Sequence, residues 1–210
     1  MAVVTVSRQY GAGGSEVARR IAAQLGWTVI DNEFVGAVAA QAGLPAEAVA
    51  AQEERVPSLM ARLARALAIS SPEVFVSGPA GAFEADEARM VEVTERVIRE
   101  AAAHGRVVMV GRGAQALLAG AKEHDALHVY VTAPRAERIR VVTGRLSIPA
   151  DDAAAVVDTT DADRDRYVQR HYGRRRDDAT NYHLTVNTAL LGYDGAADVV
   201  VAAARRRGCG

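Results

Sequence analysis

The stretch that decides the fold is VVTVSRQYGAGGSE, residues 3–16. Its first four residues are valine or threonine, which is typical of a buried strand. A glycine-rich segment follows, and a helical spacing of apolar residues begins directly after it, at Val17, Ala18, Ile21, Ala22 and Leu25. Strand, glycine-rich loop and helix in this order form the layout of a phosphate-binding loop, in which backbone N–H groups and the positive end of the helix face an anion.

The loop departs from the usual template G-x-x-x-x-G-K-[ST] at two positions. Arg8 stands in place of the first glycine and Gly14 in place of the lysine. Losing one electrostatic contact of this kind costs about 10²–10³ in rate. Arg8, at the entrance of the loop, is a candidate to fold back over the phosphates. The alternative is a tight glycine turn that joins strand to helix and binds nothing.

The predicted nucleotide contacts are consecutive residues whose backbone can close on phosphate. They are Gly11, Ala12, Gly13, Gly14, Ser15 and Glu16. Ser15 occupies the template's hydroxyl position, and it is therefore the predicted Mg²⁺ ligand.

Composition narrows the classes of function. The 210 residues include 25 basic and 26 acidic side chains, so the net charge of −1 provides no overall field for nucleic acid or an anionic membrane. A single cysteine, Cys209, excludes an internal disulfide, and the histidines show no metal-ligand spacing. The chain enters a strand without a leader pattern, and no apolar run reaches the roughly 18–20 residues of a membrane span. We expect a cytoplasmic protein with no nucleic-acid or membrane partner.

Apolar strands alternate with helical patterns along the chain. The expected strands are 3–6, 28–30, 107–110, 127–131 and a shorter, more polar 183–186. The expected helices are 15–25, 33–42, 59–68, 84–104, 112–119, 135–146, 150–172 and 195–206. Gly26 and Gly105 are placed to end helices as left-handed caps. This alternation predicts an α/β fold with a parallel five-stranded sheet flanked by helices.

The length suits a single domain, residues 1–210. Two segments, about 31–104 and 147–180, interrupt the simple alternation. Kinases of the nucleotide type hold an acceptor-binding region and a lid at these two places, which is an argument by analogy of fold.

Four segments in fixed order, SRQYGAGGSE, VIDNEF, VGRGA and NYHLTVNT, resemble the cytidylate kinase-like family of the P-loop nucleoside monophosphate kinases. The resemblance extends from Val3 to about Ala203, and the Ser-Arg-Gln-Tyr-Gly opening is quite specific for this branch. It implies a three-layer P-loop NTPase-type fold, ATP and Mg²⁺ as ligands, and phosphoryl transfer to a small nucleotide. Members of this branch often lack the lysine, which authentic cytidylate kinases keep.

The resemblance implies two acceptor-binding residues. Asp31 follows the second strand, where an aspartate faces the acceptor nucleotide; it is equally suited to cap the helix expected from Glu33. Arg112 matches the arginine of a Gly-Arg-Asp motif that holds the acceptor's phosphate, and its planar fork suits bidentate contact. The motif's aspartate is Gly113 here, so recognition of cytosine and of the acceptor's sugar is left open.

Residues 158–176, DTTDADRDRYVQRHYGRRR, resemble the arginine-rich lid helix of nucleotide kinases. The lid cations predicted to neutralise the moving phosphoryl group are Arg164, Arg166 and Arg170. Asp161 and Asp165 share a helix face and are placed to pair with nearby arginines. The cluster 174–176 is expected on the surface. The alternative for the whole run is a solvated helix face.

The sequence thus predicts an ATP-dependent phosphotransferase in which Arg8, Arg112 and the lid arginines are catalytic, with CMP, dCMP or another small metabolite as acceptor. A second hypothesis is a catalytically weak or inactive nucleotide-binding sensor, which the missing lysine favours and the retained lid arginines oppose. A third is an interaction module without a ligand. The amphipathic stripe 59–67 suits either an acceptor-side helix or a homodimer contact.

Overall fold

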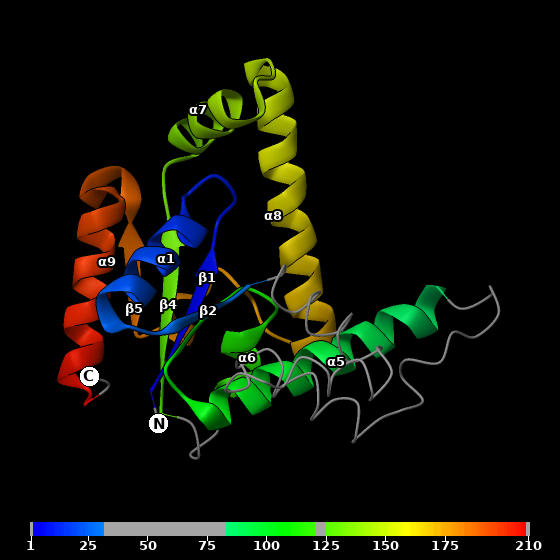
Figure 1. Cartoon of the computed structure of the whole chain (residues 1–210). Coiled ribbons are helices and arrows are strands. Elements are labelled where there is room, and N and C mark those ends of the chain that lie inside the picture. Colours follow the sequence, from blue (N-terminus) through cyan, green and yellow to red (C-terminus); the bar gives the residue numbers. More distant parts are fainter. Residues whose placement is uncertain (1, 32–82, 121–124, 209–210) are drawn as a thin grey trace, which may run out of the picture.

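A five-stranded parallel sheet forms the centre of the computed structural model, which describes residues 2–31, 83–120 and 125–208 (Figure 1). The strands are β1 (Val3–Arg8), β2 (Thr28–Ile30), β3 (Val107–Val110), β4 (Ala126–Thr132) and β5 (Leu184–Asn187). Their order is β2-β3-β1-β4-β5. All five predicted strands are confirmed, with β1 at the centre of the sheet.

The helices are α1 (Gly14–Leu25), α5 (Phe83–His104), α6 (Ala114–Leu118), α7 (Arg135–Leu146), α8 (Ala150–Tyr172) and α9 (Thr188–Arg206). The predicted bounds of α7 and α8 are confirmed. Gly26 and Gly105 have φ of 68° and 70°, as expected for left-handed caps. The helices expected at 33–42 and 59–68, and with them the dimer hypothesis, lie outside the described residues.

Two predicted helix starts were wrong. The helix after β3 begins at Ala114, not at Arg112, because residues 111–113 all have positive φ and form a loop. The last helix begins at Thr188 rather than at Gly195, because the Asn187 side chain accepts a hydrogen bond from the backbone N–H of Ala189 and caps the earlier turn. It kinks at Gly192, whose φ is 67°.

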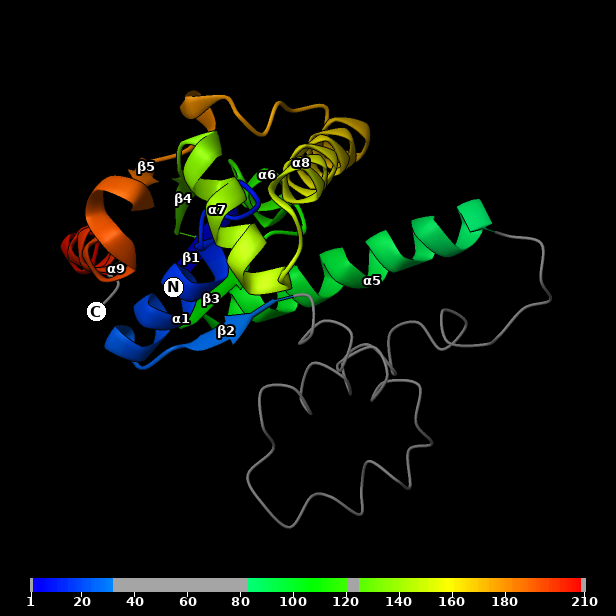
Figure 2. The ribbon, with the colours of Figure 1, turned by 90° about the horizontal axis from the view of Figure 1, so that it is seen from above.

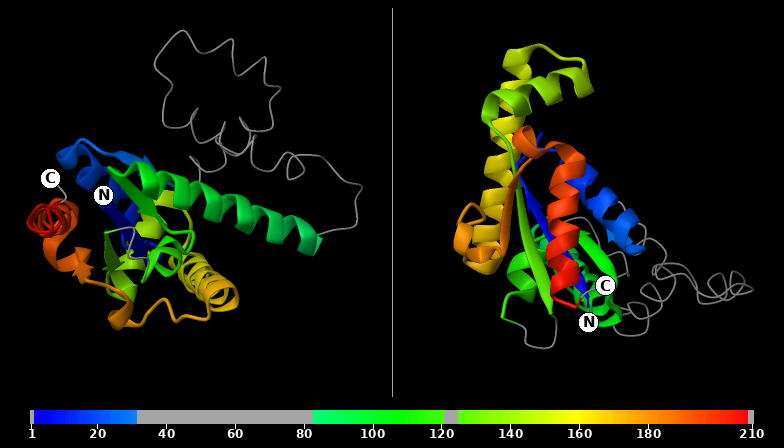
Figure 3. Two further views of the ribbon diagram at one scale, coloured as in Figure 1. Left: turned by 90° about the horizontal axis from the view of Figure 1, so that it is seen from below. Right: turned by 90° about the vertical axis from the view of Figure 1, so that its left-hand side faces the viewer.

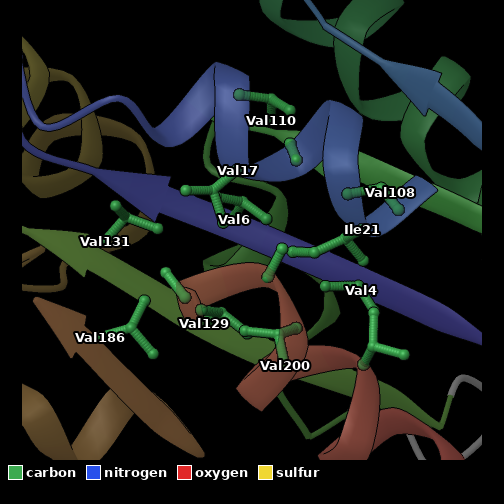
Figure 4. Close-up of a cluster of buried hydrophobic side chains, with 14 of the residues drawn as sticks. Val4, Val6, Val17, Ile21, Val108, Val110, Val129, Val131, Val186 and Val200 are labelled. Carbon is green, nitrogen blue, oxygen red and sulfur yellow. The ribbon is translucent and has the colours of Figure 1, made fainter. Parts of the chain in front are cut away.

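Helices cover both faces of the sheet (Figures 2 and 3). On one face, Val17 and Ile21 of α1 and Val200 of α9 pack against the even-numbered valines of β1 (Figure 4). On the other face, α5 and α6 pack against Val3 and the neighbouring strands. Because successive residues of a strand face opposite sides, a strand covered on both faces must be apolar throughout, as β1 nearly is.

The helices α7 and α8 form a smaller cluster of their own, built on Val142, Ala153 and Val157. Figure 1 shows α7 beyond the carboxyl ends of the strands and α8 running back beside the sheet. Within the described ranges, no helix has the length and apolar character that crossing a membrane requires.

Candidate active site

The site lies where β1, β3 and β4 end side by side. The strand order reverses at β1, because the chain places β2 and β3 on one side of it and β4 and β5 on the other. Such a switch point leaves a crevice at the carboxyl edge of a parallel sheet. Gln9, just after β1, ties the edge together: its Oε1 accepts hydrogen bonds from Thr132 Oγ1 (2.5 Å) and from the backbone N–H of Ala133 (3.2 Å).

The glycine-rich loop presents the start of α1 to this crevice. Gly13 is the N-cap of the helix, with φ of 74°, and as a glycine it has no side chain that could cap the first turn. The first helical hydrogen bond runs from the N–H of Val17 to the carbonyl of Gly13. The N–H groups of the first turn therefore remain for an anion, which the helix dipole also favours.

A cleft of about 450 Å³ adjoins the loop and includes Ser15 and Glu16 in its lining. The Ser15 hydroxyl and the loop backbone thus line one cleft, and a hydroxyl oxygen is a group that can coordinate Mg²⁺. The residues present fit a magnesium–nucleotide complex, with Ser15 as the protein's ligand to the metal. Glu16 already forms ion pairs with Arg19 (2.7 Å) and Arg20.

Close packing explains two of the loop glycines. A Cβ on Gly11 would lie 2.8 Å from the carbonyl oxygen of Arg138 in α7. A Cβ on Gly13 would lie 2.3 Å from Cε1 of Tyr193 in α9. The loop is therefore enclosed by the two helices that follow β4 and β5, which fixes its shape before any ligand arrives.

A second cavity, of about 300 Å³, lies beside the first and is strongly cationic. Its described lining contains four guanidinium groups, those of Arg8, Arg112, Arg164 and Arg176. The one carboxylate in that described lining, Asp163, forms an ion pair with Arg166. Asp161 and Asp165 balance part of this charge, and the remaining positive charge makes the cavity suited to an anion.

Burial is the main influence on the pKa values of the cluster; only Arg176 has a raised pKa, because Tyr130, Asp165 and Asp161 outweigh its burial. Burial and the positive charges of Arg164 and Arg176 lower the pKa of Arg8 to about 10, while the nearby Asp31 carboxylate acts to raise it. Burial also lowers the pKa of Arg164. Both groups stay charged at neutral pH, so an anion between them relieves an unfavourable interaction.

Asp161 of α8 anchors the cationic cluster to the loop. Its Oδ1 accepts hydrogen bonds from the backbone N–H of Tyr10 (2.9 Å) and from Arg176 (3.4 Å), and its Oδ2 accepts one from Arg138 (2.6 Å). Arg138 also donates to the carbonyl of Tyr10 at 3.1 Å. This Asp161 network joins α7, α8 and the loop, and it confirms the expected pairing of Asp161 with arginines.

The structure brings together three of the predicted catalytic arginines: Arg8, Arg112 and Arg164. It does not bring Arg166 and Arg170 to them. Those two line a neighbouring hollow along α8, which shares Asp163, Tyr167 and Arg176 with the cationic cavity. Arg166 and Arg170 are four positions apart and share a helix face, whereas Arg164 and Arg166 are two positions apart and do not.

The expectation that residues 174–176 lie on the surface was wrong for Arg176. Its side chain is only 7% exposed. It donates to Asp165 (2.7 Å) and to the carbonyl of Arg8 (2.7 Å), and it lies over the ring of Tyr130. The chain reverses after Gly173, and this reversal carries Arg176 inward in a way that no local spacing indicates.

The loop after β3 has no space for the aspartate that the Gly-Arg-Asp motif would place at position 113. A Cβ on Gly113 would lie 2.1 Å from Cε2 of Tyr172, the last residue of α8. The Tyr172 ring therefore occupies the space of a side chain at position 113. Arg112 itself has φ of 55°, a conformation that non-glycine residues adopt rarely and that often marks functional sites.

Comparison with known proteins agrees with this geometry. The sequence profile of the cytidylate kinase-like family matches residues 3–190. No curated protein matches the chain.

Solved structures share the fold at low sequence identity. An uncharacterized protein from Eubacterium ventriosum is 15% identical with a TM-score of 0.68, covering 98% of this chain and 99% of its own. Shikimate kinase from Acinetobacter baumannii, solved in complex with shikimate, is 12% identical with a TM-score of 0.51 and coverages of 99% and 94%. Shikimate kinase from Bacteroides thetaiotaomicron is 13% identical with a TM-score of 0.50 and coverages of 98% and 97%.

Proposed function

The chain belongs to the cytidylate kinase-like family, and from that premise we propose that it is an ATP-dependent phosphotransferase acting on a small anionic acceptor. One observation carries the proposal. The cleft beside the glycine-rich loop and the arginine-lined cavity share two lining residues, Arg8 and Arg164. A donor in one and an acceptor in the other would meet at these two guanidinium groups.

On the donor side, the phosphates of ATP rest on the N–H groups at the start of α1. Ser15 would hold Mg²⁺, which would neutralise part of the phosphate charge when bound. A hollow of about 240 Å³ beside the loop, lined in part by Thr188, Ala189 and Tyr193, is suited to the nucleotide base. The Thr188 hydroxyl donates to the carbonyl of Ala12 at 2.9 Å and so holds this wall against the loop.

On the acceptor side, Arg112 and Arg176 bind the anionic group of the acceptor. An oxygen of the acceptor forms a bond to the γ-phosphorus while the bond from that phosphorus to the β–γ bridging oxygen breaks, which releases ADP. A phosphate acceptor loses no proton, whereas a hydroxyl acceptor loses one to solvent. Arg8 and Arg164 lie where negative charge spreads over the transferred oxygens, so the reaction is promoted by positioning and charge.

The acceptor is proposed as CMP, dCMP or a similar small metabolite with a phosphate or carboxylate. The Tyr172 ring fills the space of the aspartate that the Gly-Arg-Asp motif would supply, so recognition of the acceptor here depends on the arginines that line the cavity. Arg166 and Arg170 have no part in the proposal, because neither lines the two cavities as described.

The test is release of ADP from ATP and Mg²⁺ with CMP, dCMP, UMP, AMP, GMP, shikimate or no acceptor. Release that depends on one acceptor supports the proposal and identifies the substrate class. ATP binding without release across the panel would favour the sensor hypothesis instead. Absence of ATP binding would leave the loop as a structural turn.

Arg112 provides the residue-level test. Arg112→Met should raise the KM for the acceptor by about tenfold to a hundredfold, because it removes one charge-assisted contact worth roughly 1.5–3 kcal/mol. Its affinity for ATP, measured by calorimetry, should stay within threefold of the wild type. An unchanged acceptor KM would contradict the assignment of Arg112.

A further inference from the structure

The loop differs from the phosphate-loop template in a paired way. The template has glycine at position 8 and lysine at position 14, whereas this chain has arginine at position 8 and glycine at position 14. One long cationic side chain is lost and another is gained, six residues apart in the same loop. The two changes have to be considered together.

In three dimensions, the two positions share one space. A Cβ on Gly14 would lie 2.5 Å from Cβ, 2.9 Å from Cγ and 3.3 Å from Cδ of Arg8. Rotation of the Arg8 side chain cannot move its Cβ, which is fixed by β1. The Arg8 backbone is held in turn, because its carbonyl accepts hydrogen bonds from Arg164 (3.3 Å) and Arg176 (2.7 Å). The space therefore admits the side chain of Arg8 or one at position 14, but not both.

The charged end of Arg8 depends on another glycine. A Cβ on Gly111 would lie 1.9 Å from Nη1 of Arg8 and 3.1 Å from its Cζ. The arginine thus extends from β1 across the start of α1 to the loop after β3. Its guanidinium lines both the cleft beside the loop and the arginine-lined cavity.

We propose that Arg8 is the catalytic cation of this site, supplied from the strand in place of the lysine that the template supplies from the helix. Gly14 and Gly111 provide the space that it occupies. The inference deepens the proposed phosphotransferase function and rests on it for the catalytic part. Burial first, and then the positive charges of Arg164 and Arg176, lower the pKa of Arg8, which agrees with a buried cation that an anion would stabilise.

The exchange changes what the cation can do. A lysine ammonium is a compact charge, whereas a guanidinium is a planar fork that can contact two oxygens at once. From its place between the cavities, Arg8 can contact the γ-phosphoryl group and the acceptor's anionic group together. Its loss should therefore lower turnover more than it weakens binding of ATP.

The experiment exchanges the two residues and reads out both binding and turnover. Calorimetry with inorganic tripolyphosphate measures the anion site without requiring catalysis, and ADP release measures turnover. We expect Arg8→Met to lower turnover by about 10²–10³ and tripolyphosphate affinity by about tenfold. The matched control is Arg99→Met on α5, an exposed arginine paired with Glu95, which should match the wild type.

The double variant Arg8→Gly/Gly14→Lys restores the template and should recover at least tenfold in both readouts relative to Arg8→Gly. Arg8→Ala/Gly14→Lys should not recover, because the Cβ that remains at position 8 still lies 2.5 Å from the Cβ of the new lysine. Thermal unfolding identifies variants that fail to fold. If the double variant fails to fold, Arg8→Met is decisive, because it keeps the unbranched aliphatic part of the side chain and removes the charge.

The outcomes separate the inference from the proposed function. If the wild type is active and Arg8→Met has the same turnover and the same affinity for tripolyphosphate, the inference is overturned while the proposed function stands. If the wild type shows no turnover, the proposed function and the catalytic part of the inference are refuted. In that case, an affinity for tripolyphosphate that falls in Arg8→Gly and recovers in Arg8→Gly/Gly14→Lys would still support a shared space for residues 8 and 14.

Discussion

Removing the carboxylate of Asp161 should destabilise the protein more than any change to an exposed acidic residue of the same helix. Asp161 is 16% exposed and accepts hydrogen bonds from Arg138 at 2.6 Å and from the backbone N–H of Tyr10 at 2.9 Å. Two of its three arginine partners, Arg138 and Arg176, are 8% and 7% exposed, and the third, Arg164, lies 3.8 Å away and is 26% exposed. In Asp161→Ala, the guanidinium groups of Arg138 and Arg176 stay buried but lose the negative charge of their shared carboxylate.

The size of the effect follows from these contacts. Removing one partner of a buried ion pair costs about 3–5 kcal/mol, because the remaining charge cannot regain its hydration. Arg176 keeps its hydrogen bond to Asp165, so the lower end of that range applies. We expect a loss of about 3 kcal/mol, which lowers Tm by about 6–12 °C for a chain of this size.

The assay is urea and thermal unfolding of wild type, Asp161→Ala and a matched control, Asp158→Ala. Asp158 lies on the same helix and forms an ion pair with Arg135 in which both side chains are more than half exposed. Such an exposed pair contributes little to stability, so the control should unfold at nearly the wild-type temperature. Limited proteolysis of α8 detects local release of this helix. Equal, small losses in both variants, with unchanged proteolysis, would refute the reasoning.

Two further predictions concern the stability of the protein rather than its turnover. Burial, followed by the positive charge of His183, lowers the pKa of His128 from 6.5 to about 4, so the stability from neutral His128 is complete above about pH 6.5 and is lost as pH falls toward 4. The difference in unfolding free energy between wild type and His128→Asn should therefore shrink by up to about 3 kcal/mol from pH 7 to pH 4, and a constant difference would contradict this. Gly113→Asp should cost about 2 kcal/mol or more in thermal unfolding, because position 113 has φ of 67° and its Cβ would meet the ring of Tyr172 at 2.1 Å. Adding Tyr172→Ala should recover part of that loss, and strict additivity of the two changes would count against the clash.

Much of the architecture could be predicted from local patterns. Most of the strands are largely apolar segments, and α7 and α8 begin and end where the helical spacing does. Helix starts were less predictable, as at Arg112 and Gly195, because they depend on backbone conformation and capping. Three successive positive φ values around Arg112 delay one helix, and the cap of Asn187 advances the other.

The candidate site was predicted only in part. Arg8, Arg112 and Arg164 were identified from motif positions, since each follows a strand or lies on the expected lid helix. Arg176 was not, because its burial depends on the path of the chain after α8. Arg138 was also missed: it is one of several arginines in α7, and only contact with Asp161 and Tyr10 distinguishes it.

By itself, the sequence determined the periodicity of the strands and helices, the phosphate-loop layout and the absence of its lysine, because these are properties of neighbouring residues. Only the tertiary structure decided which charges meet. The order of the parallel strands brings the ends of β1 and β3 together, and α8 folds back along them. Whether Arg8 and Gly14 share one space, or Arg176 is buried, depends on contacts between segments far apart in the chain, which no local spacing encodes.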